Sequence, residues 1–113
     1  MLALLDEIAA RQATRARLIR RLFATFHPLG MVAGVGGDTD EIRLRLGVGR
    51  LLQVALRPSF PRTLPFLTLY TAGNNQAVRK EEVRKAEVFD VHDRSTEALT
   101  AGLVQYVIRL LVE

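Results

Sequence analysis

The chain has 113 residues, enough for one domain with a single hydrophobic core and too few for two. With 49% hydrophobic and 25% charged residues it has the composition of an ordinary globular protein, and its net charge of +4 comes almost entirely from arginine. It contains no cysteine, which excludes disulfides, thiolate metal sites and cysteine-based catalysis.

Residues 1–27 are predicted to form one amphipathic helix. Positions spaced alternately by three and four residues follow the heptad seam of a coiled coil; they are Leu2, Leu5, Ala9, Gln12, Ala16, Ile19, Phe23 and Phe26. Either the last of these side chains dock on the core of a globular domain formed by 28–113, or residues 1–16 are the end of a longer coiled coil that pairs with a partner. We expect Leu2, Leu5, Ile19 and Phe23 to carry such an interaction.

Three strands are predicted before the middle of the chain. A short one covers 31–35, and two strands follow in which apolar residues alternate with polar ones. To place both apolar sets on one face, the loop between these two strands must have an odd number of residues. A loop of Gly47, Val48 and Gly49, with Gly49 in the left-handed region as a bulge, pairs Leu44 with Leu52 and Ile42 with Val54.

The second half of the chain is predicted to hold one more strand and two helices. The strand is 66–71, and a charged, mostly solvated helix covers 76–89. A final helix begins near Ser95 or Thr96, with Leu99, Leu103 and Leu110 in its buried stripe. The fold class is therefore α+β: a small antiparallel sheet of three to four strands with an N-terminal helix and C-terminal helices packed on one face.

Between the third and fourth strands lies Phe60-Pro61-Arg62-Thr63-Leu64-Pro65. Prolines cannot sit inside a paired central strand, so this segment is predicted to be a rigid joint, anchored on the core by Phe60 and stiffened by Pro61 and Pro65. An aromatic-Pro-x-x-x-Pro segment at this place resembles the hallmark of RWD domains and of their relatives, the ubiquitin-conjugating enzymes and their inactive variants.

That resemblance implies a non-catalytic member, because active conjugating enzymes carry a catalytic cysteine and a His-Pro-Asn segment that this chain lacks. It implies a protein-interaction module within a larger complex. In several kinetochore subunits an N-terminal coiled coil leads directly into an RWD domain, often in a dimer, and the seam described above is similar. A ubiquitin-pathway scaffold or adaptor is the alternative. The partner is expected to be a second copy or a different chain.

A basic patch is the other candidate site. Arg43, Arg45, Arg57 and Arg50 are predicted to line the outer sheet face. Guanidinium groups there suit an acidic peptide or a phosphorylated partner; equally, the patch is the solvated face of an antiparallel sheet. Nucleic acid is a further alternative, less favoured because we expect no interleaved aromatic residues for base stacking.

No catalytic, cofactor or metal site is predicted. The glycines of 34–37 precede a strand and not a helix, which favours a turn over a phosphate loop. Asp38, Asp40 and Glu41 lack the calcium-loop pattern, and the two histidines accompany no nucleophile motif. No apolar run approaches the roughly 18–20 residues that span a bilayer. We expect an intracellular protein, nuclear or cytoplasmic.

Overall fold

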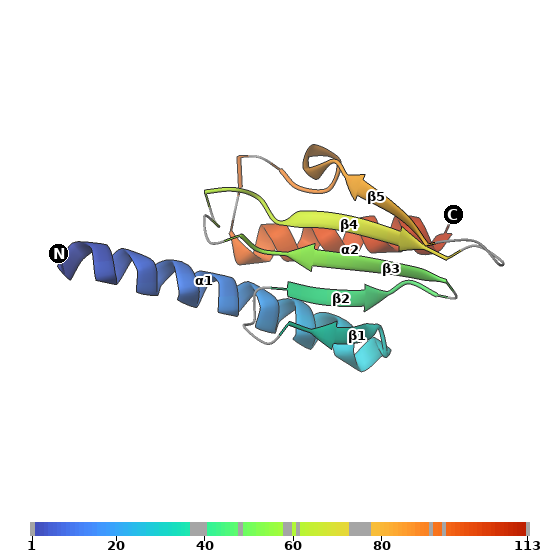
Figure 1. The fold of residues 1–113 in the computed structure, drawn as a ribbon, viewed down its shortest axis with the longest axis horizontal. Helices are drawn as coiled ribbons and strands as arrows, with labels where there is room; N and C mark the ends of the chain where they lie inside the picture. Colours follow the sequence, from blue (N-terminus) through green and yellow to red (C-terminus); the bar gives the residue numbers. More distant parts are fainter. Residues whose placement is uncertain are drawn as a thin grey trace.

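A computed structural model describes residues 2–36, 41–47, 49–57, 60, 62–72, 78–90, 92–93 and 95–112; the side chains of 2–9 and 11 lie outside the description. The chain folds as an α+β unit (Figure 1). Its elements, in order, are helix α1 (Leu2–Phe26), the 3-10 turn η1 (His27–Leu29), strands β1 (Val32–Val35), β2 (Glu41–Arg45), β3 (Arg50–Ala55), β4 (Phe66–Thr71) and β5 (Arg79–Val83), the 3-10 turn η2 (Lys85–Glu87) and helix α2 (Thr96–Val112).

The five strands form one antiparallel sheet in the order of the sequence. The predicted register is confirmed, since Leu44 lies opposite Leu52 and Ile42 opposite Val54. Gly49 has the predicted left-handed backbone, with φ of 80°. The pairing then continues through β4, where Leu52 lies opposite Leu69, so apolar residues of neighbouring strands line up in rows on one face.

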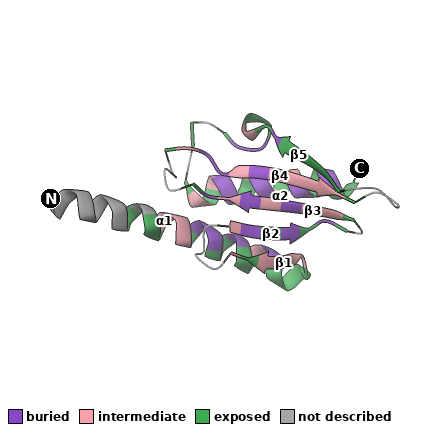
Figure 2. Cartoon of the chain, viewed as in Figure 1, coloured by how far each residue is buried: buried purple, intermediate pink, exposed green. Residues whose placement is uncertain are grey.

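Both helices lie on that face (Figure 1). The second half of α1 contacts β2 and α2, and its buried side chains are Leu18, Ile19, Leu22 and Phe26. In α2 the buried stripe is Leu99, Thr100, Leu103, Val107 and Leu110. These side chains and the inward rows of the sheet form one hydrophobic core (Figure 2). The first half of α1 runs on beyond the end of the sheet strands (Figure 1).

The proline-containing segment joins two neighbouring strands, as predicted. Ala55 ends β3 and lies directly opposite Phe66, the first residue of β4. Residues 56–65 therefore connect the paired ends of these two strands. Phe60 is only 1% exposed and belongs to the core. Pro65 is buried as well, whereas Pro61 lies outside the described residues. The aromatic ring therefore fastens the loop to the core.

The predicted helix at 76–89 is wrong. Residues 79–83 form β5, and Lys85–Glu87 form η2, so the sheet has five strands and α2 is the one α-helix after it in the described chain. Val83 is the buried residue of β5 and lies opposite Leu67. The other four residues are charged and exposed, a composition that protects an edge strand from pairing with another chain. Their charges resemble those of a solvated helix, which explains the error.

The start of α2 agrees with the sequence. The backbone N–H of Ala98 donates to Ser95 Oγ at 3.2 Å, so Ser95 caps the helix and satisfies one of its unpaired amides. Neither α1 nor α2, as far as the structure describes them, is both long and apolar enough to cross a membrane.

Candidate functional site: the open face of the sheet

The face of the sheet opposite the helices is not covered by any described helix or strand. We call it the open face. It consists of the alternate residues of β2–β5 that lie on the side away from the helices: Glu41, Arg43, Arg45, Leu51, Gln53, Ala55, Phe66, Thr68, Tyr70, Lys80 and Glu82. Antiparallel sheets commonly keep one such face in water.

Hydrogen bonds cross three strands of this face. Gln53 Nε2 donates to Glu41 Oε2 at 2.6 Å, and Tyr70 Oη donates to Gln53 Oε1 at 3.0 Å. The three residues come from β2, β3 and β4, and all are half-buried. Because the amide of Gln53 is held at both ends, the hydroxyl of Tyr70 has a fixed acceptor and its ring has a preferred orientation.

Arg43 lies across the β1 side of the open face. Its Nε is 3.8 Å from Glu41 Oε1, and its side chain is 47% exposed. Its guanidinium also lies over Gly34 of β1: a Cβ added there would be 2.9 Å from Nη2. Glu41 therefore already has partners in Gln53 and Arg43, and its negative charge is partly compensated.

At the end of the face next to the proline-containing loop, two cations contact Phe66. The guanidinium carbon of Arg57 is 4.5 Å from the centroid of the ring, and Nζ of Lys85 is 3.4 Å from it. Cations are attracted to the negative face of an aromatic ring, by about 0.5–1 kcal/mol at exposed sites. The ring and its two cations hold β4, the loop and η2 together.

At the opposite end of the face there is an apolar hollow of about 450 Å³. Leu51 and Tyr70 line it side by side, since they are directly paired in the sheet. Ala72 and Val78 complete its larger apolar residues, and Gly47, Gly49, Arg45 and Arg50 also line it. Val78 is 59% exposed. An apolar side chain bound here would lose contact with water.

The open face and its margin are positively charged. Among the residues that the structure describes, they carry five cations, Arg43, Arg45, Arg57, Lys80 and Lys85, against two anions, Glu41 and Glu82. The surplus of three positive charges compares with +4 for the whole chain. This face therefore attracts anionic groups.

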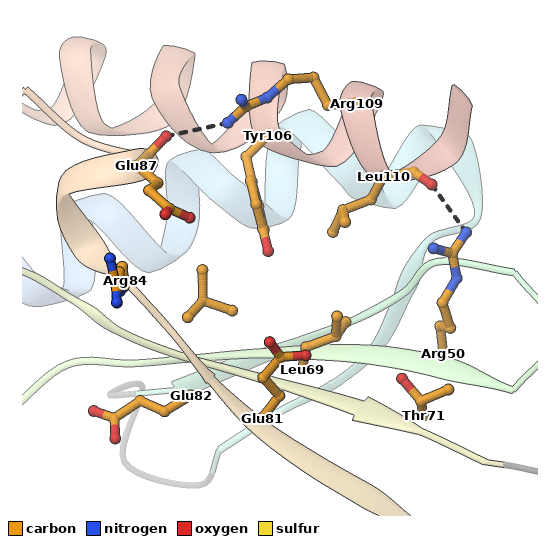
Figure 3. Close-up of a pocket in the computed structure, with 11 residues that line it drawn as sticks. Arg50, Leu69, Thr71, Glu81, Glu82, Arg84, Glu87, Tyr106, Arg109 and Leu110 are labelled. Atoms are coloured by element: carbon orange, nitrogen blue, oxygen red, sulfur yellow. Dashed lines mark hydrogen bonds between the residues drawn. The ribbon is translucent and has the colours of Figure 1, made fainter. Parts of the chain in front are cut away.

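A second pocket, of about 500 Å³, lies between α2 and strands β4 and β5 (Figure 3). Its charged lining is balanced, with three arginines and three glutamates: Arg50, Arg84, Arg109, Glu81, Glu82 and Glu87. Two of the arginines hold the fold together. Arg50 Nη2 donates to the carbonyl of Leu110 at 3.0 Å, and Arg109 Nη2 donates to that of Glu87 at 3.1 Å. Balanced charge and structural arginines give this pocket no preference for a ligand of one sign.

The sequence-predicted residues lie in different parts of the structure. Arg43 and Arg45 are exposed on the open face, and Arg57 is at its margin. Arg50 is not part of this patch, because its side chain lies on the helix side and binds the C-terminal end of α2.

The candidate residues of the first helix are also separated. Ile19 is 2% exposed and belongs to the core. Phe23 is 39% exposed, and its ring stacks on His27 with centroids 4.6 Å apart. The side chains of Leu2 and Leu5 lie outside the described part of the chain.

The aromatic residues of the open face were not predicted from the sequence. We expected none among the arginines, but Phe66 and Tyr70 lie there, four residues apart on β4. The alternation of residues 66–71 would have placed both on one face. Lys80 and Glu82 were missed for another reason, since their segment was assigned to a helix.

No known family, curated protein or solved structure matches this chain. Among the described residues, no three His, Asp or Glu side chains are grouped so that they could hold a metal ion.

Proposed function

We propose that this chain is a non-catalytic, intracellular protein-interaction module with an RWD-like arrangement, and that it joins a larger assembly as a dimer through α1. The proposal rests on one observation above all: α1 is a continuous helix of 25 residues whose buried side chains are confined, among those described, to its second half. At about 1.5 Å per residue such a helix is about 37 Å long, and a long part of it runs beyond the sheet (Figure 1).

The first half of α1 is the segment that we expect to pair with a partner. Isolated helices shorter than about 12–15 residues are marginal in water, because the entropy cost of nucleating them is barely offset. In residues 10–17 the described side chains are exposed or half-buried. Pairing along the heptad positions Leu2, Leu5 and Ala9 would bury apolar surface and stabilise this half.

The outer side of α2 offers further apolar surface. Ile108 is 53% exposed and Leu111 is 49% exposed, and residues three apart share one face of a helix. Val104, half-buried, lies one turn before Ile108. This stripe would extend an interface that begins on α1.

The resemblance to kinetochore-type RWD subunits supports the choice of a dimer. The loop of residues 56–65, with buried Phe60 and Pro65, lies between a third and a fourth strand as that resemblance requires. The fifth strand and the single C-terminal α-helix depart from the expected pattern. A ubiquitin-pathway adaptor remains the alternative, and titration of labelled protein with ubiquitin tests it directly.

Light scattering at several protein concentrations tests the dimer. We expect a mass that approaches twice 12.6 kDa as the concentration rises. The double variant Leu2→Lys/Leu5→Lys should return the full chain to the mass of a monomer. The matched variant Ala10→Lys/Ala13→Lys adds the same charge to exposed positions of α1 outside the heptad seam and leaves Leu2 and Leu5 unchanged, so it should affect association less.

Two results would argue against a homodimer. A full chain that stays monomeric at every concentration, and captures no partner chain from a native extract through α1, contradicts the proposal. Equal association of both double variants would place the contact elsewhere, and Ile108→Lys/Leu111→Lys then shows whether α2 carries it.

A further inference from the structure

We propose that the open face docks an acidic, extended segment of a protein partner, and that one large apolar side chain of that segment enters the hollow lined by Leu51, Tyr70 and Val78. Because it takes the chain to be a protein-interaction module, this assignment rests on the function proposed above. It concerns a different surface, on the side of the sheet that faces away from both helices.

Charge complementarity predicts that the bound segment of the partner is negatively charged. In the described part of the chain, the open face and its margin hold five cations and two anions, and one anion, Glu41, already has Gln53 and Arg43 as partners. Arg45 and Lys80 lie in the same row of the sheet as the hollow, since Arg45 is opposite Leu51 and Lys80 is opposite Tyr70. Carboxylates on either side of the anchor would therefore meet a cation on each side.

The hollow provides specificity that charge alone does not. Leu51, Tyr70, Ala72 and Val78 line it, and a large apolar side chain that enters it removes apolar surface from water, which favours binding. The hydrogen bond from Tyr70 to Gln53 orients one wall before a ligand arrives. Such preorganisation lowers the entropy cost of binding.

The same features favour a peptide over nucleic acid. Single-stranded nucleic acid binds to basic surfaces through bases stacked on open aromatic rings. Here Phe66 already has Arg57 and Lys85 against its ring, and the hydroxyl of Tyr70 is tied to Gln53. Glu82 lies on the edge strand β5, opposite Thr68, and would repel a phosphate backbone on that side of the face.

The test uses the full chain labelled with ¹⁵N and a short peptide of Glu and Asp residues around one central Leu. We expect amide shifts that saturate and are centred on Leu51, Tyr70, Ala72 and Lys80. Replacing the central Leu of the peptide by Ser, or Val78 of the protein by Ser, should weaken binding about tenfold. Val78 is exposed, so its replacement leaves the core intact.

Charge is tested with a matched pair of double variants. Arg45→Glu/Lys80→Glu should abolish binding, whereas Arg17→Glu/Arg20→Glu changes the net charge by the same amount on exposed positions of α1 and should preserve it. Loss in both variants would show attraction to net charge alone and overturn the docking site. Equal binding of the Leu and Ser peptides would remove the anchor.

Two further results would overturn the proposal. The first is an absence of saturable shifts with the acidic Leu peptide, and the second is its displacement by oligothymidine, which would assign the face to nucleic acid. These titrations test the open face and do not depend on whether the chain dimerises. Dimerisation through α1 is measured separately, by light scattering on the α1 variants.

Discussion

The carbonyl oxygen of Val88 lies directly against Gly102 of α2, so close that a Cβ added to Gly102 would be 2.5 Å from it. No real side chain tolerates that distance, and the neighbouring atom is backbone, which cannot move aside cheaply. Gly102 therefore allows α2 to pack closely against the segment that follows η2. That segment contains Val88 and Phe89, which are both buried.

Gly102→Ala should destabilise the protein, although glycine-to-alanine changes inside helices usually stabilise by about 0.5–1 kcal/mol. We expect a loss of about 1–3 kcal/mol, typical of overpacking. Urea unfolding followed by circular dichroism measures it. Gln105→Ala, at an exposed position one turn later, is the control and should change stability by less than about 0.5 kcal/mol. A stabilised Gly102→Ala variant would contradict this packing.

Phe60→Ala should cost about 3–5 kcal/mol, the range for removing a buried aromatic ring. The ring is 1% exposed and fastens the 56–65 loop to the core. Leu29→Ala is a suitable control, because Leu29 is 68% exposed. Thermal unfolding should give a lower melting temperature for Phe60→Ala than for Leu29→Ala. Equal melting temperatures would mean that Phe60 does not anchor the loop.

Tyr70→Phe removes one hydroxyl from the open face and leaves the apolar wall of the hollow. The lost hydrogen bond to Gln53 should lower the free energy of unfolding by about 0.5–1.5 kcal/mol. The side-chain amide signals of Gln53 should shift in the ¹⁵N spectrum, because its oxygen loses a donor. Unchanged Gln53 signals would show that the two side chains do not interact in solution.

Asp93 should titrate below its ordinary pKa of 3.8. Its carboxylate accepts a hydrogen bond from the backbone N–H of Ser95, which lowers the pKa most, and a second one from the side chain of Ser95. The N–H contact is 3.1 Å long. A lowered pKa in the folded state means that the carboxylate stabilises the fold above the unfolded pKa and that this contribution is lost as the pH falls through the folded pKa. Carbon-detected NMR titration measures the shift.

Two variants separate the causes of that shift. Ser95→Ala removes the hydroxyl but keeps the backbone N–H, so it should raise the pKa of Asp93 only in part. Asp93→Asn should remove this residue's contribution to the loss of stability in acid. If Asp93 titrates at or above 3.8 in the wild-type chain, the hydrogen bonds to Ser95 are absent in solution.

Alternation and turn chemistry predicted the centre of the sheet correctly. The register of Leu44 with Leu52, the left-handed Gly49 and the bounds of 66–71 all follow from local rules: a period of two and a loop that glycine permits. Phe60 was predicted to be an anchor because it is the aromatic residue of the proline-containing segment, where the ring can pack on the core while the prolines stiffen the loop. These features depend on residues close together in the chain, so the sequence contains the necessary information.

The missed features depend on residues distant in the chain. Arg79–Val83 have the charges of a solvated helix, and it is their pairing with β4, through Val83 and Leu67, that makes them a strand. Once that strand was missed, Lys80 could not be placed beside Tyr70. The apolar hollow was hidden for the same reason, since Val78 and Leu51 are neighbours only in the folded sheet.

The continuity of α1 has a mechanical consequence. A helix that starts at Leu2 and ends at Phe26 without a break transmits an axial pull from its free end to Leu18, Ile19, Leu22 and Phe26. These four side chains are buried in the core. A pull along the helix axis therefore acts on all four at the same time, as a shear force, and does not detach them one after another. A partner bound to the N-terminal half of α1 would thus be coupled stiffly to the sheet, and force would reach the domain through these four buried side chains.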